Sequence, residues 1–485
     1  MAGIGFRLQK LFQEDYYSSR IKAYGFSLFV TAGPWLMVIL GVTAIHYVLS
    51  FFHFLSIEEQ RLFTISISYC FIFSQIIYGS LQLIVTRYVA DLLYEQKTDK
   101  LFASFLGMTK IILFFAIVLW GIFSILTPLP LYYKIMLLFL FLALNIIWIQ
   151  SIYLTAAKDY QSIALAFLVG AVISITGIII VSYTHPTLHL EHGSAFLLLT
   201  CFTVGTFITL GWLSVVMVKM FPKNETKDQF IFLTYLDKYP ELFWAGLLYN
   251  IGIWVCNFII WFGEGNELIA GSFLYHPLYD TSVFWAYLTI IPTYIFFVVS
   301  IETRFYKRYK NFFGTVNSGG TLNQILHQKD SMKVVLRQEV ERLLRTQGIF
   351  TFLIIFGIWI YMSQSGLRSL QYSIFQLTAI GAYSNSMVLV MTLLLLYFDD
   401  RKGAFRTAAL FFFANLTLTA ILLPLGYNGY GLSFAIGSSI AFLYSISRIF
   451  NYVQQIDYYT FCTPTALYTK RNFFTKLANK LNKYA

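Results

Sequence analysis

The chain has 485 residues, of which 58% are hydrophobic and only 12% are charged. Soluble domains are about half apolar and about a quarter charged, so this composition excludes a soluble enzyme, a coiled coil and a disulfide scaffold. Its hydrophobicity also excludes intrinsic disorder, which needs a polar chain. The composition therefore predicts an all-α polytopic protein whose helices span a membrane.

A helix that crosses the roughly 30 Å hydrocarbon core of a bilayer needs about 20 mainly apolar residues. Twelve stretches meet this requirement, and breaks rich in Pro, Gly and charge separate them. The first stretch has 26 residues, which favours a retained span over a cleavable signal peptide. The predicted spans are residues 24–49, 62–85, 102–127, 131–156, 162–183, 194–219, 241–263, 282–301, 347–363, 371–397, 405–424 and 429–450.

The basic residues are unevenly distributed between the two sides of these spans. If the N-terminus is cytoplasmic, the inner segments hold 30 of the 34 Lys and Arg residues, and the outer segments hold only Arg61, Lys134 and Arg368. The positive-inside rule therefore predicts that both termini are cytoplasmic, in agreement with an even number of spans. The net charge of +11 then faces the anionic headgroups of the lipid bilayer, and no nucleic-acid partner is expected.

Twelve spans divide into two six-helix bundles around the loop at residues 219–240, a plan common among transporters. The longest segment between spans is basic, and its apolar residues recur at helical spacing. We expect this amphipathic helix to lie on the bilayer surface, and docking of a cytosolic partner is the alternative. The predicted regions are an amphipathic cytoplasmic segment 1–23, an N-terminal bundle 24–219, a cytoplasmic linker 220–240, a C-terminal bundle 241–450 that contains the basic cytoplasmic loop 302–346, and a basic cytoplasmic tail 451–485.

Uncharged polar and aromatic side chains recur on single faces of several predicted spans. In the seventh span, Asn250, Trp254 and Asn257 share one helix face. An amide in hydrocarbon needs a hydrogen-bond partner, so these faces are expected to point into the bundle. Amides with aromatic rings suit a neutral sugar chain, although hydrogen bonds between helices explain any single amide equally well. The predicted pathway residues are Gln75, Tyr78, Gln82, Asn250, Trp254, Asn257, Trp285 and Thr289.

Two prolines lie inside predicted spans, where the missing amide hydrogen interrupts a helix. Gly33-Pro34 in the first span and Pro292 in the eighth are therefore predicted helix kinks. Each kink is either static or part of a moving helix that lines a cavity.

Four charged residues near the inner ends of spans are predicted to form a cytoplasmic mouth or gate. Arg87 and Asp91 are one helical turn apart below the second span, where a structural pair is the alternative to a gate. Glu302 and Arg304 follow the eighth span.

No pattern in the sequence predicts a catalytic residue, a metal site or a cofactor. The four cysteines are scattered and none belongs to a C-x-x-C pair. His185, His189 and His192 cluster in an outer loop, where a solvated loop is favoured over a zinc site. Asp399-Asp400 precedes basic residues and is interpreted as a surface ion-pair cluster, with a site for a metal and nucleotide sugar as the alternative.

Short motifs between residue 1 and about residue 406 form an ordered set. They are Met1-Ala2-Gly3-Ile4-Gly5-Phe6, Ala23-Tyr24-Gly25, Gly33-Pro34-Trp35, Thr86-Arg87-Tyr88-Val89-Ala90-Asp91, Asn250-Ile251-Gly252-Ile253-Trp254, Ile301-Glu302-Thr303-Arg304-Phe305-Tyr306 and Tyr397-Phe398-Asp399-Asp400-Arg401. Together they resemble the PelG family, the multispanning membrane subunits of Pel exopolysaccharide export systems. That family belongs to the multidrug/oligosaccharidyl-lipid/polysaccharide exporter superfamily.

The resemblance implies that the two six-helix bundles surround a central cleft. It implies transport of a partly deacetylated aminosugar polymer across the bacterial cytoplasmic membrane. It also implies a cytosolic glycosyltransferase (PelF-like), a membrane receptor for cyclic di-GMP (PelD-like) and a further membrane subunit (PelE-like) as partners. Sugar transfer would then belong to the glycosyltransferase, and this chain is not expected to be an enzyme.

Four other functions remain open at this point. A flippase for lipid-linked oligosaccharides would share the fold, and a non-transporting scaffold would only hold the glycosyltransferase at the membrane. A multidrug antiporter is disfavoured, because ion-coupled carriers usually have a carboxylate within the membrane. An integral membrane glycosyltransferase would require Asp399 or Asp400 for sugar transfer.

Overall fold

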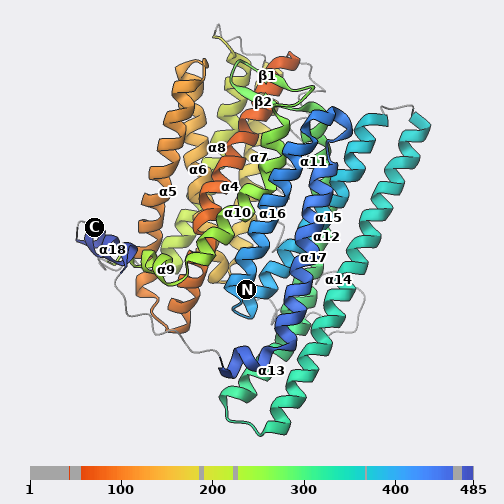
Figure 1. Ribbon diagram of the computed structural model, residues 1–485. Coiled ribbons are helices and arrows are strands. Elements are labelled where there is room, and N and C mark those ends of the chain that lie inside the picture. The colour runs from red at the N-terminus through yellow and green to blue at the C-terminus, as the bar shows by residue number, and fades with distance from the viewer. Residues whose placement is uncertain are drawn as a thin grey trace. The chain divides into compact units, whose positions relative to one another are not determined.

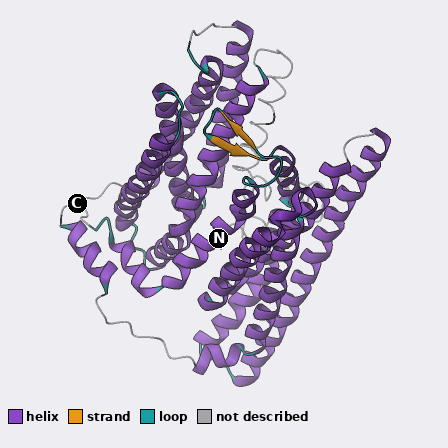
Figure 2. Ribbon diagram, turned by 45° about the horizontal axis from the view of Figure 1, so that its top comes forward, coloured by secondary structure: helices purple, strands orange, loops and turns teal. Residues whose placement is uncertain are grey.

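The computed structural model describes residues 43, 56–184, 190–221, 228–365, 369–462 and 472–483. The predicted segment 1–23, the first predicted span 24–49 and the predicted kink at Gly33-Pro34 lie outside these residues. Figure 2 shows that the described chain is almost entirely helical and has one small two-stranded sheet. The prediction of an all-α architecture is therefore confirmed.

Eleven helices among the described residues are long and apolar enough to cross a membrane, and they coincide with the second to twelfth predicted spans. The chain is therefore a multi-pass membrane protein, as predicted. The elements of these spans are α4 (Ile57–Tyr94), α5 (Asp99–Leu126), α6 (Leu131–Ala156), α7 (Tyr160–Thr184), α8 (Gly193–Met220), α10 (Pro240–Ile260), α11 (Pro277–Thr289), α12 (Ile291–Phe297), the π-helix η2 (Val298–Phe305), α13 (Tyr306–Asn317), α14 (Leu322–Ser365), α15 (Ser369–Tyr397), α16 (Arg401–Leu422) and α17 (Leu432–Gln454).

Short elements connect or follow these helices. They are the 3-10 helix η1 (Ile231–Leu233), α9 (Thr234–Lys238), the strands β1 (Glu267–Ile269) and β2 (Phe273–Tyr275), the 3-10 helix η3 (Leu423–Asn428), the π-helix η4 (Tyr458–Cys462) and α18 (Phe473–Asn482). The two strands pair antiparallel, with Leu268 opposite Leu274.

The chain forms two compact units. The described parts of Gly33–Trp254, Gly265–Tyr275 and Tyr468–Ala485 make up the N-unit, and those of Val255–Glu264 and His276–Leu467 make up the C-unit. The chain passes from one unit to the other inside α10, after Trp254. The predicted domain boundaries, which placed this division at residues 220–240, remain a prediction.

In the N-unit, α6 packs against α4, α5 and α8, and α7 packs against α8 (Figure 1). Small residues allow the close approach of α7 and α8, as is common between membrane helices. A Cβ atom on Gly170 would lie 2.0 Å from Thr209 Oγ1, and one on Gly205 would lie 2.0 Å from Ser174 Oγ. The core of this unit contains the buried apolar residues Leu140, Leu144, Ile178 and Leu198.

The last described helix is held to the N-unit at both of its ends. Asp237 in α9 accepts hydrogen bonds from the backbone amides of Phe474 and Thr475, which have no acceptor within α18 because they lie in its first turn. At the other end of α18, the Asn482 side chain accepts a hydrogen bond of 2.8 Å from the Phe230 amide. The basic tail thus ends in a helix that is fixed to the segment before α10.

In the C-unit, α15 packs against α11 and α17, and a break in backbone hydrogen bonding separates α11 from α12. Pro292 lies at this break. The Thr293 amide donates to Ile290 O, so the carbonyl of Thr289 lacks its usual partner four residues later. Gln347 in α14 replaces that partner, because its Nε2 donates to Thr289 O at 2.9 Å.

The basic loop 302–346 is a helical hairpin made of the end of η2, α13 and the first part of α14. The apolar residues Met332, Leu336, Val340 and Leu343 are buried, because α14 packs against α12, η2, α13 and α15. This arrangement differs from the expected helix on the bilayer surface. The apolar face of the helix instead serves the protein's own packing, and α14 continues without a break into the next span.

The packing of α4 against α10 depends on two glycines of the N-unit. A Cβ atom on Gly79 would lie 2.2 Å from Asn250 Nδ2, and one on Gly246 would lie 2.4 Å from the carbonyl oxygen of Gly79. Contacts this short would force the two helix backbones apart.

Replacing Gly79 by Ala is therefore expected to lower the free energy of unfolding by about 1–3 kcal/mol, the usual cost of overpacking a core. Thermal unfolding of the purified protein in detergent would measure this change. Gly121→Ala in α5 is the matched control, because nothing lies within 4 Å of the added Cβ there. Equal unfolding midpoints for both variants would contradict the close crossing of α4 and α10.

Candidate functional site

Four predicted pathway residues come together in the N-unit, where α4 meets α10. Gln75 Oε1 accepts a hydrogen bond of 3.2 Å from Trp254 Nε1. Asn250 lies one turn earlier on α10, against Gly79, and donates to Gly246 O at 2.8 Å. Uncharged groups of two different spans are thus joined by an amide–indole bond in the apolar part of the chain.

The aromatic part of this group extends to α6. The ring of Tyr78 lies 5.9 Å from that of Trp148, and Trp148 Nε1 donates to Ser74 Oγ at 3.1 Å. Trp148 was absent from the predicted set, although the polar residues Asn145 and Ser151 lie three positions before and after it on the same helix face. We name Gln75, Tyr78, Trp148, Asn250 and Trp254 the amide–aromatic cluster.

The predicted gate residues Arg87 and Asp91 lie further along α4 and contact the segment before α10. Their ion pair has a distance of 3.4 Å, and Tyr235 Oη in α9 donates to Asp91 at 2.9 Å. Burial and the bond to Asp91 raise the pKa of the Tyr235 phenol, which therefore stays protonated and keeps donating. Gln82, another predicted pathway residue, is partly buried on α4 between this pair and the amide–aromatic cluster.

The predicted residue Asn257 belongs to a different group, in the C-unit. Its Nδ2 donates to Asp280 Oδ1 at 2.7 Å, and Trp261 Nε1 donates to Asp280 Oδ2 at 2.9 Å. The His276 amide donates to the same Oδ2 at 3.0 Å. Three N–H donors from two helix ends thus surround one carboxylate.

His276 is fully buried beside this carboxylate and caps α11. Its Nδ1 accepts from the Tyr279 amide at 3.1 Å, and Nε2 lies 2.9 Å from Glu264 O. Because Nδ1 accepts and Nε2 faces a carbonyl oxygen, this geometry fits the neutral imidazole with its proton on Nε2. The sequence placed Asp280 at a span end, and no pattern there signalled its burial. The only signal for this group in the sequence is that Asp280 lies four residues after His276 and 23 residues after Asn257.

The remaining predicted pathway residues lie on α11 and differ in exposure. Trp285 is 48% exposed, whereas Thr289 is 3% exposed. The Thr289 hydroxyl donates to Ala286 O of its own helix at 2.7 Å, which is a common state of Thr in membrane helices. Neither residue joins Asn257 in the group around Asp280.

The second pair of predicted gate residues is described only in part. Arg304 Nη1 lies 3.4 Å from Glu339 Oε1, and Arg342 Nη1 lies within 2.9 Å of both oxygens of that carboxylate. Glu339 is buried, so its charge is balanced by two arginines at the base of the helical hairpin. The side chain of Glu302 lies outside the described residues.

The interpretation of Asp399-Asp400 as a surface ion-pair cluster fits Asp399, which pairs with Arg401 at 3.5 Å, but needs correction for Asp400, which is only 6% exposed. Its carboxylate caps α16 through the Gly403 amide at 3.0 Å and pairs with Arg448 Nε at 2.7 Å. Asp400 is thus a structural link between α16 and α17.

The histidine cluster is described only at His192. Its Nδ1 lies 2.9 Å from Glu59 Oε1, and Glu59 Oε2 accepts from the Ala195 amide in the first turn of α8. His185 and His189 lie outside the described residues. Within the part of the chain that is described, no group of three metal-ligating side chains occurs.

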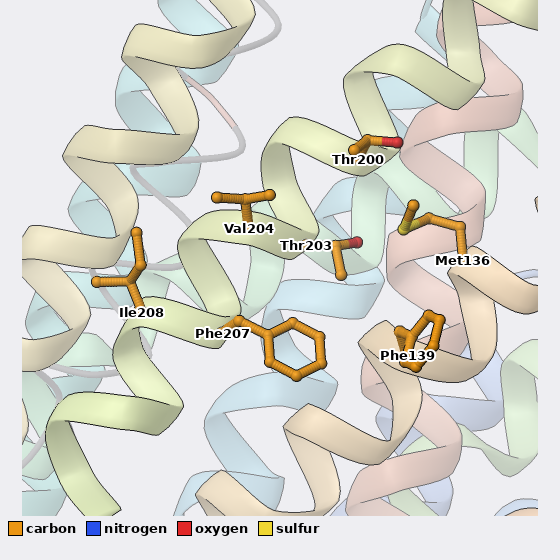
Figure 3. A pocket seen from close by; sticks show the side chains of 7 residues that line it. All are labelled: Met136, Phe139, Thr200, Thr203, Val204, Phe207 and Ile208. Carbon is orange, nitrogen blue, oxygen red and sulfur yellow. The ribbon is translucent and has the colours of Figure 1, made fainter. Parts of the chain in front are cut away.

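A groove of about 350 Å³ lies between α6 and α8 in the N-unit (Figure 3). Its lining is almost wholly apolar and includes none of the predicted pathway residues. Phe139, Val204 and Phe207 in this lining are each more than 40% exposed. The groove therefore offers few hydrogen bonds to a sugar and suits acyl chains better. Its lining residues are Met136, Phe139, Thr200, Thr203, Val204, Phe207 and Ile208.

The family model described as "PelG: Putative exopolysaccharide Exporter (EPS-E)" matches residues 1–461. The chain belongs to the PelG exopolysaccharide exporter family. This finding confirms the resemblance seen in the sequence motifs, and it confirms the expectation of a transporter rather than an enzyme. Among curated proteins, no relative matches the chain.

Solved structures with the same fold are transporters of the MATE family and the MOP superfamily. A MATE family multidrug resistance transporter matches in its inward-facing conformation, with 10% identity over 85% of this chain and 96% of that chain and a TM-score of 0.56. Its outward-facing conformation matches with 11% identity over 88% and 96% and the same TM-score. A MOP superfamily transporter from Pyrococcus furiosus matches with 12% identity over 89% and 96% and a TM-score of 0.58. At these identities the likeness shows the fold alone.

Replacing Asp280 by Ala is expected to destabilise the C-unit strongly. The change would leave the Asn257, Trp261 and His276 N–H groups without their acceptor, at a cost of about 1–3 kcal/mol for each buried donor that stays unpaired. Thermal unfolding in detergent would measure the loss.

Two further variants make the Asp280 test specific. Asp280→Asn keeps one acceptor oxygen and should lie between the wild type and the Ala variant. Asp330→Ala removes an exposed carboxylate of α14 and should leave the unfolding midpoint unchanged. An Asp280→Ala protein as stable as the Asp330→Ala protein would contradict the structural role of this carboxylate.

Proposed function

We propose that this chain carries an exopolysaccharide, a Pel-like aminosugar polymer, across the bacterial cytoplasmic membrane as one subunit of a synthase and export complex. The observation that carries this proposal is the amide–aromatic cluster, in a chain that belongs to an exopolysaccharide exporter family. Sugar rings need hydrogen bonds for their hydroxyl and amide groups and flat apolar surfaces for their ring faces. Gln75, Asn250, Trp148 and Trp254 supply both kinds of group at one place.

The charges in the described spans support a cargo path that does not depend on a free intramembrane carboxylate. Asp280 is buried, but three N–H groups already donate hydrogen bonds to its two carboxylate oxygens. A cation would compete with these donors for the same oxygens. We therefore propose that Asp280 holds the start of α11 in place, and that the cluster in the N-unit and the half-exposed Trp285 in the C-unit each contact the glycan.

The proposal includes an orientation and partners. The basic loops face the cytoplasm, where a cytosolic glycosyltransferase supplies the growing polymer, with a cyclic-di-GMP receptor and a further membrane subunit in the same complex. Movement between inward-facing and outward-facing states is proposed by analogy with the transporters that share this fold. Arg87, Asp91 and Arg304 are proposed to lie near the cytoplasmic mouth.

A protection assay separates transport from a scaffold role. Inside-out membrane vesicles that contain the synthase complex receive radiolabelled nucleotide sugar, and the polymer that resists added glycosidase is measured with and without this chain. We expect synthesis to continue without the chain while protection disappears. Loss of synthesis itself would favour a scaffold, and protected label that extracts with lipid would favour a flippase for lipid-linked sugars.

In the same assay, Trp285→Ala is expected to reduce the protected polymer several-fold while polymer synthesis stays unchanged. Trp359→Ala in α14 is the matched control, because the two tryptophans are 48% and 51% exposed and lose equal volume. Trp359 lies among the exposed apolar residues Phe352 and Phe356, which face lipid. Equal protection by both variants would remove Trp285 from the pathway.

A further inference from the structure

The helical hairpin formed by η2, α13 and the first part of α14 extends well past the membrane-spanning part of its helices. Helix α14 has 44 residues, or about 66 Å at 1.5 Å per residue, which is about twice the hydrocarbon thickness. In Figure 1 the joined ends of α13 and α14 form the lowest part of the C-unit. Part of this hairpin must therefore stand in water.

The position of the hairpin tip can be estimated along α14. Leu326 precedes the apolar stretch that begins at Gln347 by 21 residues, which is about 31 Å of helix. Even at a tilt of about 40°, near the upper end for membrane helices, about 24 Å of this length points away from the bilayer. The headgroup layer is only about 6 Å thick on each side, so the tip lies beyond it.

The tip is ordered although it stands in water. Thr321 and Gln324 form a reciprocal capping box at the start of α14, with Thr321 N donating to Gln324 Oε1 and Gln324 N donating to Thr321 Oγ1. Closer to the membrane, Lys329 pairs with Asp457 at 2.7 Å. The Glu339 carboxylate binds two arginines of the hairpin. These contacts make the hairpin a rigid projection.

The surface of the projection combines exposed leucines with excess positive charge. Leu322 is 70% exposed and Leu326, one turn later on the same helix, is 38% exposed. Two leucines held at a rigid tip in water are an unfavourable arrangement unless another surface covers them. The exposed charged residues between 304 and 346 are seven basic side chains against two acidic ones. The basic ones are Arg304, Lys307, Arg308, Lys310, Arg337, Arg342 and Arg345.

We propose that the hairpin is a docking surface for a cytosolic protein that presents an apolar pocket with an acidic rim. Leu322 and Leu326 enter the pocket, and the basic residues of α13 face the acidic rim. The distance of the tip from the headgroups favours a protein over a lipid surface as the partner. The identity of that partner rests on the proposed function, in which the cytosolic glycosyltransferase must stay close to the chain that accepts its polymer.

Binding between two purified components tests this docking surface. The full chain, in nanodiscs of neutral phosphatidylcholine, is titrated with the purified glycosyltransferase of its export complex, and the dissociation constant is measured by biolayer interferometry. The double variant Leu322→Asn with Leu326→Asn is expected to weaken binding at least about tenfold, because such central apolar anchors dominate interface energies. Arg308→Gln with Lys310→Gln should mainly lower the association rate and its salt dependence.

The control is Leu425→Asn. This variant changes a 57% exposed leucine in η3, which follows the C-terminal end of α16. Wild-type affinity is expected for this variant. Absent binding by the wild-type chain, or equal affinity of the double leucine variant, would overturn the proposal. Thermal unfolding in phosphatidylglycerol vesicles adds a further test, because a lipid-specific shift that the hairpin variants abolish would reassign the surface to the membrane.

The same proteins distinguish failure of docking from failure of the proposed function. If glycosidase protection depends on this chain while the glycosyltransferase binds it with no help from the hairpin, the docking proposal fails and the transport proposal stands. If glycosyltransferase binding requires Leu322 and Leu326 but protection of the polymer does not depend on this chain, the transport proposal fails. The docking proposal then stands, and the chain acts as a scaffold.

Discussion

A polar group placed in hydrocarbon must find its hydrogen-bond partner inside the protein, and this constraint shapes the packing within each of the two units. In the N-unit the amide of Gln75 meets the indole of Trp254. In the C-unit the carboxylate of Asp280 collects three N–H donors, and Gln347 supplies the donor that the backbone of Thr289 lacks. The same pairs that keep these groups stable in the membrane also fix which helix faces meet.

This constraint bears directly on the choice between structural and functional interpretations of the polar residues. A side chain that is bonded within the bundle can still contact a glycan with a second face, because an indole offers its ring and an amide has more than one hydrogen-bonding group. The proposed glycan contacts of Trp148 and Trp254 depend on this possibility, because the indole N–H groups of both residues are already bonded within the protein. By contrast, the Thr289 hydroxyl is bonded within its own helix and offers less to a passing sugar.

Hydrophobic length predicted the eleven described spans well, because it follows from the thickness of the bilayer and is a property of single segments. Residue pairs such as Gln75 with Trp254 were not predictable, since they depend on which helices become neighbours. Asp280 was missed for the same reason: its burial results from two helix ends that meet in space. The amphipathic pattern of residues 332–343 was visible in the sequence, but the surface that covers it, packed protein rather than lipid, was not.

The bond from Gln347 to the carbonyl of Thr289 changes the meaning of the break between α11 and α12. A proline kink in an isolated helix bends over a range of angles, because its free carbonyl has no fixed partner. Here the side-chain amide of Gln347 in α14 donates a hydrogen bond to the carbonyl of Thr289, and this bond favours one bend angle. Any larger swing of α12 must first break this bond and leave a buried amide unpaired, a cost that opposes a continuous range of bend angles.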